Sequence, residues 1–173
     1  NPILENHKYF HSIDNCKLEK IRKTVILDFK DENYENNFSK NVFRNLNKAN
    51  KNNVYHDSQL SDDNINNFYT LYNESMLKKN ADLRFYYKKS YFFELIKNFH
   101  NNVKLLIAFQ NKKVLGGILS IHHNNIASVH LSAYNSMGLS NGVAYYLRYN
   151  LIKYYQDEVS FLHFGGGNSN KDD

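Results

Sequence analysis

The sequence is poor in residues that cross-link small secreted domains and in residues that break regular structure. Its 173 residues include one cysteine, one proline and no tryptophan. A single cysteine excludes an intramolecular disulfide and a cysteine-based zinc site, and it suits a reducing compartment. One proline beside 14 tyrosines and 12 phenylalanines favours a packed fold over a disordered tail.

Long apolar runs are also absent. No stretch reaches about 18 apolar residues, so the sequence predicts no transmembrane segment. No signal peptide is visible, and we expect a cytoplasmic protein, with peripheral contact with a membrane left open. The chain begins at Asn1 rather than methionine and ends soon after a glycine run. We therefore expect it to be part of a longer protein.

Positive charge is in excess, with a formal net charge of +5 and a pI of about 9.1. Such a balance permits an anionic partner, for example a nucleotide, a phosphate-bearing substrate or RNA. A solvated, lysine-rich surface explains the same numbers. The charge alone does not separate these two interpretations.

Hydrophobic periodicity predicts one α/β domain with a mixed sheet. Strands are expected over residues 24–29, 53–58, 103–109, 114–122, 126–134 and 159–164, and helices over residues 35–51, 61–79, 88–99 and 141–156. The three strands between 103 and 134 form an antiparallel meander, so a purely parallel sheet is excluded. We expect residues 1–22 to be an irregular lead-in and residues 23–173 to form the domain.

Three local predictions accompany these elements. The apolar, β-branched run 24–29 is expected to be a buried strand. Ser140 or Asn141 is expected to cap the last helix. The pair Gly116-Gly117 inside a strand predicts a bulge or a close backbone approach.

The predicted helix 35–51 is amphipathic. Its apolar face carries Phe38, Val42, Leu46 and Ala49. The opposite face carries four basic residues, Lys40, Arg44, Lys48 and Lys51. We interpret this basic face as an anion-binding surface for phosphate groups, with simple solvation as the alternative.

Candidate site residues gather in the last third of the chain. Two predicted strands each carry a histidine near the carboxyl end, His130 and His163. Ligands of open α/β sheets bind beyond the carboxyl ends of strands, and a loop entering a helix offers free N–H groups to an anion. Consecutive glycines permit a close approach. We therefore expect the site to include Ser132, Asn141, Gly165, Gly166 and Gly167.

Further candidates are aromatic or cationic. Tyr134 and Tyr145 are candidates for stacking on a donor or substrate. Arg84, in the aromatic loop 80–87, suits a carboxylate or phosphate clamp, or else it pairs with Asp82. Each histidine, taken alone, has a structural alternative in which it satisfies a buried backbone carbonyl. The pattern predicts no metal site.

Three motifs together resemble one family. His130-Leu-Ser-Ala133 precedes His163-Phe-Gly-Gly-Gly167, Phe43–Val54 is a basic helix after the first strand, and Val114–Leu119 is a glycine-containing strand. In this order they resemble the Fem-type branch of the GNAT acyltransferase superfamily, which includes the bacterial aminoacyltransferases of peptidoglycan bridges. The resemblance covers roughly residues 24–167.

The resemblance implies a twisted mixed sheet with helices on both faces, opened where two middle parallel strands splay. It implies transfer of an acyl or aminoacyl group to an amine in cell-wall or envelope biosynthesis, with His130 and His163 as catalytic candidates. The donor would be aminoacyl-tRNA or acyl-CoA, with no tightly bound cofactor. The acceptor would be an amine-bearing cell-envelope precursor.

Two departures leave alternatives open. CoA-using relatives carry a glycine-rich pyrophosphate loop, Q/R-x-x-G-x-G/A, which residues 134–142 do not match. Fem-type chains also contain two such domains, whereas this sequence has room for one. The second hypothesis is a non-catalytic GNAT-like domain that binds RNA or an envelope precursor. A third is a capsule- or lipid-modifying N-acyltransferase.

Overall fold

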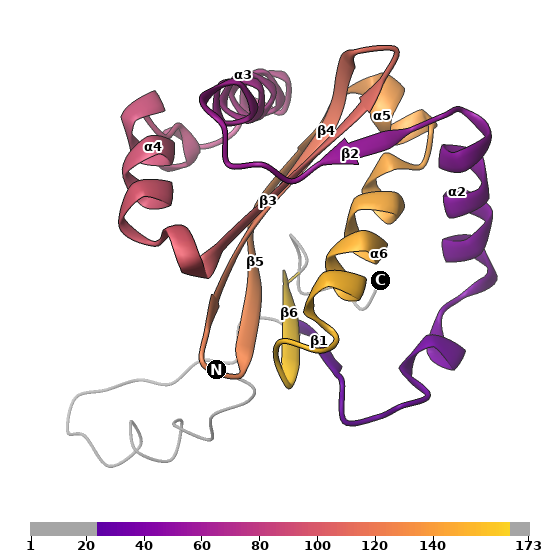
Figure 1. The fold of residues 1–173 in the computed structure, drawn as a ribbon. Coiled ribbons are helices and arrows are strands. Elements are labelled where there is room, and N and C mark those ends of the chain that lie inside the picture. Colours follow the sequence, from indigo (N-terminus) through magenta and orange to yellow (C-terminus); the bar gives the residue numbers. More distant parts are fainter. Residues whose placement is uncertain (1–23, 167–173) are drawn as a thin grey trace.

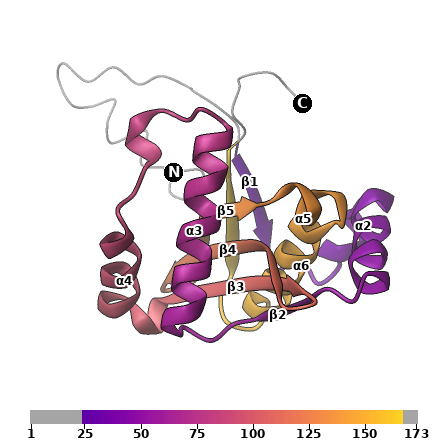
Figure 2. The same cartoon turned by 90° about the horizontal axis from the view of Figure 1, so that it is seen from above.

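The computed structural model describes residues 24–166. The expected lead-in, residues 1–22, and Gly167 lie outside this range. The described chain forms a six-stranded sheet in the order β1-β6-β5-β4-β3-β2. Helices cover both of its faces, as the two views in Figure 1 and Figure 2 show. The predicted α/β architecture, a twisted mixed sheet between helices, is confirmed.

The elements follow the predicted order with one addition. The strands are β1 (Thr24–Asp28), β2 (Tyr55–Asp57), β3 (Val103–Gln110), β4 (Lys113–His123), β5 (Ile126–Tyr134) and β6 (Phe161–Gly166). The α-helices are α2 (Lys40–Lys51), α3 (Asp62–Lys78), α4 (Lys89–Asn98), α5 (Ser136–Ser140) and α6 (Val143–Tyr155). Short 3₁₀ turns span Tyr34–Asn37, Leu83–Phe85 and His100–Asn102. Helix α5 is the element that periodicity did not predict.

One strand pair of the sheet formed by the described residues is parallel, and it is short. β5 and β6 share three residue pairs, Ile126–Phe161, Ala127–Leu162 and Ser128–His163. Beyond the last pair, β5 continues to Tyr134 on β4, and β6 continues to Gly166 on β1. The two parallel strands therefore separate toward their carboxyl ends, as the family resemblance implies.

The sheet divides the interior into two apolar layers. Leu105 and Ile107 of β3 face the layer under α3 and α4, while Leu106 and Ala108 face the layer under α2 and α6. This alternation is the two-residue period of a strand. Figure 1 shows α3 and α4 on one side of the sheet and α2 and α6 on the other.

The first strand is not buried as predicted. Among residues 24–166, β1 is an edge strand paired with β6 alone, and its Val25 is 64% exposed. An apolar, β-branched run is compatible with either a central or an edge position, because periodicity reports the type of element and not its neighbours.

Helix α2 starts later than predicted, at Lys40 rather than near Glu35. Phe38 and Ser39 have extended backbones, which separate the 3₁₀ turn from the helix. Phe38 nevertheless packs inward, with its ring 6.0 Å from Tyr34 and 6.5 Å from Tyr149 between centroids. The helical spacing of Phe38 and Val42 was therefore a coincidence of two different local conformations.

The expected cap of the last helix is also wrong. Asn135 caps α5, where its side chain accepts a hydrogen bond from the Gly138 N–H at 2.7 Å. Gly142 precedes α6 in a left-handed conformation, with φ of 75°. Ser140 instead donates back to the Met137 carbonyl at 2.9 Å.

The Gly116-Gly117 prediction is confirmed for the bulge, which lies directly beside the pair, and is wrong for the close backbone approach. The register between β3 and β4 shifts between Ala108 and Phe109, which is a bulge. A Cβ on Gly116 would lie 2.6 Å from the ring of Tyr134, and one on Gly117 would lie 2.5 Å from the ring of Phe68. The close approaches come from aromatic rings rather than from backbone, and the missing side chain of Gly116 leaves room for the ring of Tyr134.

Candidate functional site

The two candidate histidines flank the point where β5 and β6 separate. His163 belongs to the last pair of the parallel ladder, opposite Ser128, and His130 lies two residues farther along β5. Leu162 and Phe164 face the α2–α6 layer, so alternation turns His163 toward the other face. The prediction that neighbouring strands carry these histidines is confirmed, but both lie within their strands rather than near the carboxyl ends, since β5 runs on to Tyr134 and β6 to Gly166.

His130 has a specific partner on helix α4. Its Nε2 lies 2.6 Å from the hydroxyl oxygen of Tyr91. The contact places His130 on the α3–α4 side of the sheet, where the β4–β5 register shifts between Leu119 and Ser120. Burial lowers the pKa of His130 and raises the pKa of Tyr91, so both groups are neutral near pH 7.

His163 is half-buried, and its Nε2 is enclosed. That nitrogen makes no hydrogen bond with any residue in the range 24–166. A buried ring nitrogen without a partner retains its capacity to accept or donate a proton. The structural alternative for His163, a bond to a backbone carbonyl, is thus not seen for Nε2 within the described chain.

A different set of groups lies on the opposite face of the sheet, near the point where β5 and β6 separate. Tyr134, the last residue of β5, packs its ring on Gly116. The Arg148 guanidinium of α6 lies 5.9 Å from the centre of that ring. Burial raises the pKa of Tyr134, while the charge of Arg148 and the Ser132 hydroxyl act in the opposite direction. A cation and a phenol therefore lie together where β5 ends.

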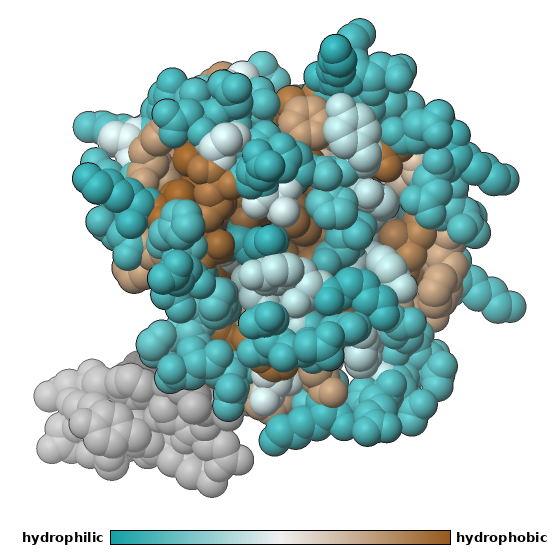
Figure 3. Space-filling view, viewed as in Figure 1, coloured by the Kyte–Doolittle hydropathy of each residue, from teal (hydrophilic) through white to brown (hydrophobic). Residues whose placement is uncertain are grey.

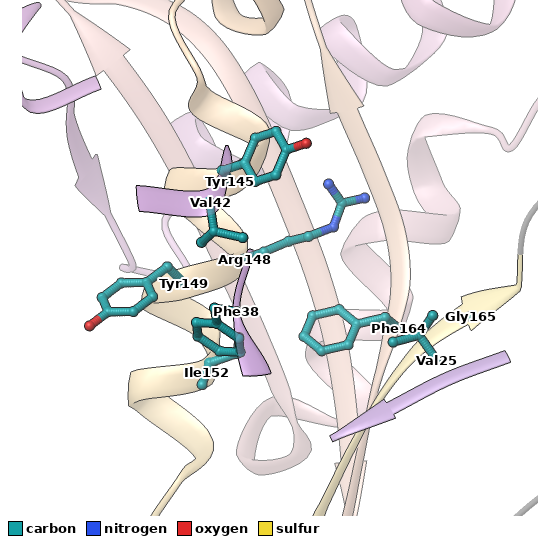
Figure 4. A pocket seen from close by; sticks show the side chains of 9 residues that line it. All are labelled: Val25, Phe38, Val42, Tyr145, Arg148, Tyr149, Ile152, Phe164 and Gly165. Carbon is teal, nitrogen blue, oxygen red and sulfur yellow. The ribbon is translucent and has the colours of Figure 1, made fainter. Parts of the chain in front are cut away.

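An apolar cleft continues from Arg148 between α2, α6 and the strands β1 and β6. Its volume is about 390 Å³. Figure 4 shows Arg148 extending from α6 toward the strands, with its guanidinium nearer Tyr145 than Phe38 or Ile152. Nine residues line the cleft: Val25, Phe38, Val42, Tyr145, Arg148, Tyr149, Ile152, Phe164 and Gly165.

One asparagine connects two predicted site residues at this cleft. Asn41 of α2 donates to the Tyr145 hydroxyl at 2.9 Å, and its own side-chain oxygen accepts from Arg44 at 2.6 Å. Tyr145, predicted as a stacking residue, and Arg44, predicted as an anion contact, therefore belong to one hydrogen-bonded group.

The structure distributes the remaining predicted residues over several places. Gly165 lines the cleft, and Gly166 pairs with Thr24 of β1. Asn141 donates to Gln110 at 3.2 Å, between α5 and α6. Arg84 is separate: it lies in the turn before α4, 3.8 Å from the Asp82 carboxylate, which is the alternative considered for it. The basic residues Lys40, Arg44, Lys48 and Lys51 are all exposed on α2.

Tyr91, Asn41 and Arg148 were missed in the sequence. Tyr91 is 39 residues from His130, and no local pattern connects positions on different elements. A weak signal existed for Arg148, since it is the sole arginine of its helix and follows the predicted Tyr145 by three residues, which places both on one helix face.

Two classes of feature are absent from residues 24–166. No group of three or more histidine, cysteine, aspartate or glutamate side chains is arranged to hold a metal ion. No helix in this range is long and apolar enough to cross a membrane.

The splayed mixed sheet is the fold that the Fem-type resemblance implies, and solved structures share it. One is FemX, with a TM-score of 0.73 and 13% identity over 90% of this chain and 57% of that one. Another is L-PGS from Bacillus licheniformis, with a TM-score of 0.59 and 10% identity over 88% and 49%. The C-terminal domain of a proposed lysylphosphatidylglycerol synthetase from Agrobacterium fabrum has a TM-score of 0.65 and 7% identity over 86% and 47%.

These likenesses confirm the resemblance at the level of the fold. The chain spans about half the length of the structures it matches. No family model and no curated protein matches the sequence.

Proposed function

We propose that this chain is the transferase domain of a Fem-like protein that moves an acyl or aminoacyl group onto an amine in cell-wall or envelope biosynthesis. The observation that carries the proposal is the opened β5–β6 pair. His163 lies at its last ladder pair, and His130, bonded to Tyr91, lies just beyond it. The fold shared with FemX and L-PGS supports the same class of reaction.

Transfer of an acyl group to an amine has three requirements, which one site must meet. The attacking amine must be neutral, the carbonyl oxygen needs donors, and the leaving group needs a proton. In our proposal the amine nitrogen attacks the ester or thioester carbon, a C–N bond forms, and the C–O or C–S bond breaks. The amine proton passes to a histidine, and a proton is returned to the leaving alcohol or thiol.

The two histidines suit these roles because each retains a usable nitrogen. A neutral imidazole with a pKa lowered by burial, as in His130, accepts a proton and readily gives it up. Backbone N–H groups freed where β5 and β6 part are suited to hold the carbonyl oxygen. The strands themselves would then supply the donors, and the side chains the proton transfer.

The donor is an acyl ester or thioester, and aminoacyl-tRNA or acyl-CoA is the form we propose. Neither needs a tightly bound cofactor, and both are cytoplasmic molecules. Residues 135–142 form a capped helical turn rather than a glycine-rich loop, which favours aminoacyl-tRNA. The exposed basic face of α2 is the proposed contact for the phosphates of the donor, and the acceptor is an amine-bearing envelope precursor.

A reconstituted assay with charged tRNA, acetyl-CoA and a muropeptide acceptor tests the proposal. His130→Ala and His163→Ala are expected to abolish turnover while circular dichroism reports an unchanged fold. Full activity in both variants would refute the site assignment. A matched control is His100→Ala, an exposed residue before β3, which should leave turnover unchanged.

A further inference from the structure

We propose that the α2–α6 cleft binds an anionic amphiphile, a molecule with one apolar chain and a carboxylate or phosphate head held at Arg148. The inference rests on the proposed function in one respect: it makes this amphiphile a substrate of the transferase. The binding itself follows from the walls of the cleft and from one cation, and it is testable without turnover.

The walls of the cleft are suited to a hydrocarbon chain. Five of the nine lining residues are apolar, namely Val25, Phe38, Val42, Ile152 and Phe164. A volume of about 390 Å³ falls within the range of small-molecule sites, about 300–1,000 Å³. Burying apolar surface is favourable, so the cleft has a driving force for taking up an apolar group.

This apolar lining is partly open to solvent. Val25 is 64% exposed and Tyr145 is 36% exposed. Figure 3 shows patches of hydrophobic surface on both sides of the molecule, one of them on the side where α6 and α2 lie. A contiguous exposed apolar lining marks a binding site more often than it marks ordinary surface.

Arg148 gives the cleft its charge. Neighbouring cations are already engaged, since Lys153 pairs with Glu35 at 2.5 Å and Arg44 bonds Asn41. Arg148 makes no ion pair with any residue from 24 to 166, and its guanidinium rests against the Tyr134 ring. A half-buried guanidinium beside apolar walls favours a bound anion, and its planar fork matches a carboxylate or a phosphate.

The cleft lies next to the point where β5 and β6 separate. Phe164 and Gly165, which line the cleft, directly follow His163 in β6. Because alternation turns His163 to the other face of the sheet, a substrate in the cleft would meet the histidines through the gap between β5 and β6. A head at Arg148 therefore lies toward the end of β5, beside Tyr134, while the chain extends between Phe38 and Ile152. A nucleic acid strand suits this cleft poorly, because it would place many phosphates against apolar walls and a single cation.

Calorimetric titration with decanoate and with decyl phosphate tests the inference, and decanol and butyrate serve as controls. We expect saturable binding of at least one anionic probe and much weaker binding of butyrate. Arg148→Met should weaken anion binding by about tenfold and leave decanol unaffected. Lys97→Met on exposed α4 removes one positive charge elsewhere and should change affinity less than about twofold.

Methyl NMR locates the bound probe. Shifts are expected at Val25, Val42 and Ile152, and not at Ile65 or Ile96 in the other apolar layer. Val42→Glu puts a carboxylate into the cleft and should abolish binding, which keeps the inference testable if Arg148→Met fails to fold. Decanoate and decyl phosphate together identify which head is preferred.

Three results would overturn the inference: no saturable binding of either anionic probe, equal binding by Arg148→Met, or shifts confined to the α3–α4 layer. Titration uses neither donor nor acceptor. Amphiphile binding without any turnover would therefore refute the proposed function alone. Turnover with substrates that lack an apolar chain, and without amphiphile binding, would refute this inference alone.

Discussion

The Tyr91 hydroxyl oxygen and Nε2 of His130 lie 2.6 Å apart, and this bond joins helix α4 to strand β5. The Tyr91 ring is itself stacked on Tyr87, with centroids 4.5 Å apart. The stacking on Tyr87 thus fixes the orientation of the Tyr91 ring and directs its hydroxyl at the imidazole. With both groups neutral near pH 7, Tyr91 donates to Nε2 in the tautomer that carries its proton on Nδ1.

Tyr91→Phe removes the hydroxyl and keeps the ring. We expect it to lower kcat on the order of 10²-fold, as loss of a positioned proton-transfer partner does, with little change in stability. The acidic limb of the pH–rate profile should shift as well, because the imidazole loses a neutral partner. Steady-state kinetics between pH 5.5 and pH 9 measures both effects.

Tyr87→Phe is the matched control, since it also deletes a phenolic hydroxyl from the same stack. Its kcat and pH profile should stay within about twofold of the parent values. If the two variants behave alike, the bond to His130 has no part in turnover, and Tyr91 is a packing residue.

Stability is expected to fall on acidification because two histidines are held neutral in the fold. Burial lowers the pKa of His130, and burial together with Lys104 lowers the pKa of His56. In the unfolded chain both titrate near about 6.5. Below that pH the unfolded state binds more protons, so the free energy of unfolding decreases until the pH reaches the lowered, folded-state values.

Urea titrations at pH 7.5, 6.5, 5.5 and 5.0 measure this slope. His56→Gln and His130→Gln should each flatten it, and the double variant should flatten it most. Asp57, whose pKa is lowered by hydrogen bonds from Gln59 and Asn64, loses its stabilisation at more acidic pH. An unchanged slope in the double variant would show that other groups control the transition.

The order of elements was predictable because the apolar residues of each helix and strand repeat with the spacing typical of that element. The β3–β4–β5 meander, α3 and α4 follow from residues within one element. The start of α2 and the cap of α5 did not, because they depend on single residues. Phe38 keeps an extended backbone while packing on Tyr149, and Asn135 accepts from the Gly138 N–H.

The site was predictable to the same extent. The positions of His130 and His163 on two neighbouring strands were predictable from the pattern of each strand, and their role in a site stays a prediction. The Tyr91 contact, the Asn41 link and the Arg148 cleft depend on which elements pack together, and periodicity does not specify that. The cleft forms only because β1, at the start of the described chain, pairs with β6 at its end. The apolar run 24–29 predicted a buried strand and did not indicate that β1 lies at the edge of the sheet.

The approach of α2 to α6 has a direct mutational test. Gly142 has φ of 75°, and a Cβ there would lie 2.5 Å from the backbone oxygen of Asn45. Gly142→Ala therefore combines backbone strain of about 1–2 kcal/mol with overpacking of about 1–3 kcal/mol. Thermal and urea unfolding should show a loss near the sum of these two terms.

Gly165 provides the comparison, because its φ of 82° is similar while a Cβ would meet nothing within 4 Å. Gly165→Ala should lose only the strain of about 1–2 kcal/mol. Equal losses at the two positions would mean that α2 yields easily at Asn45, and that the cleft between the helices is less rigid than its geometry indicates.

The basic face of α2 distinguishes the transferase from the non-catalytic RNA-binding alternative. Lys48 and Lys51 are exposed in the last turn of α2. If this face binds donor phosphates, Lys48→Glu with Lys51→Glu should weaken binding of a tRNA acceptor-stem RNA. It should also reduce the dependence of log K on log salt by about 1 for each phosphate that is no longer neutralised.

Lys88→Glu with Lys97→Glu changes the net charge equally at exposed positions around α4. A specific phosphate site on α2 predicts that this pair leaves the salt slope near its parent value, because steering by net charge alone is not localised. Equal weakening by both pairs would identify a general charge effect, and absence of RNA binding at 50 mM salt would make the basic face a solvated surface. RNA binding through α2 together with turnover that needs His130 would favour the transferase, since a domain that only binds RNA has no use for the imidazole.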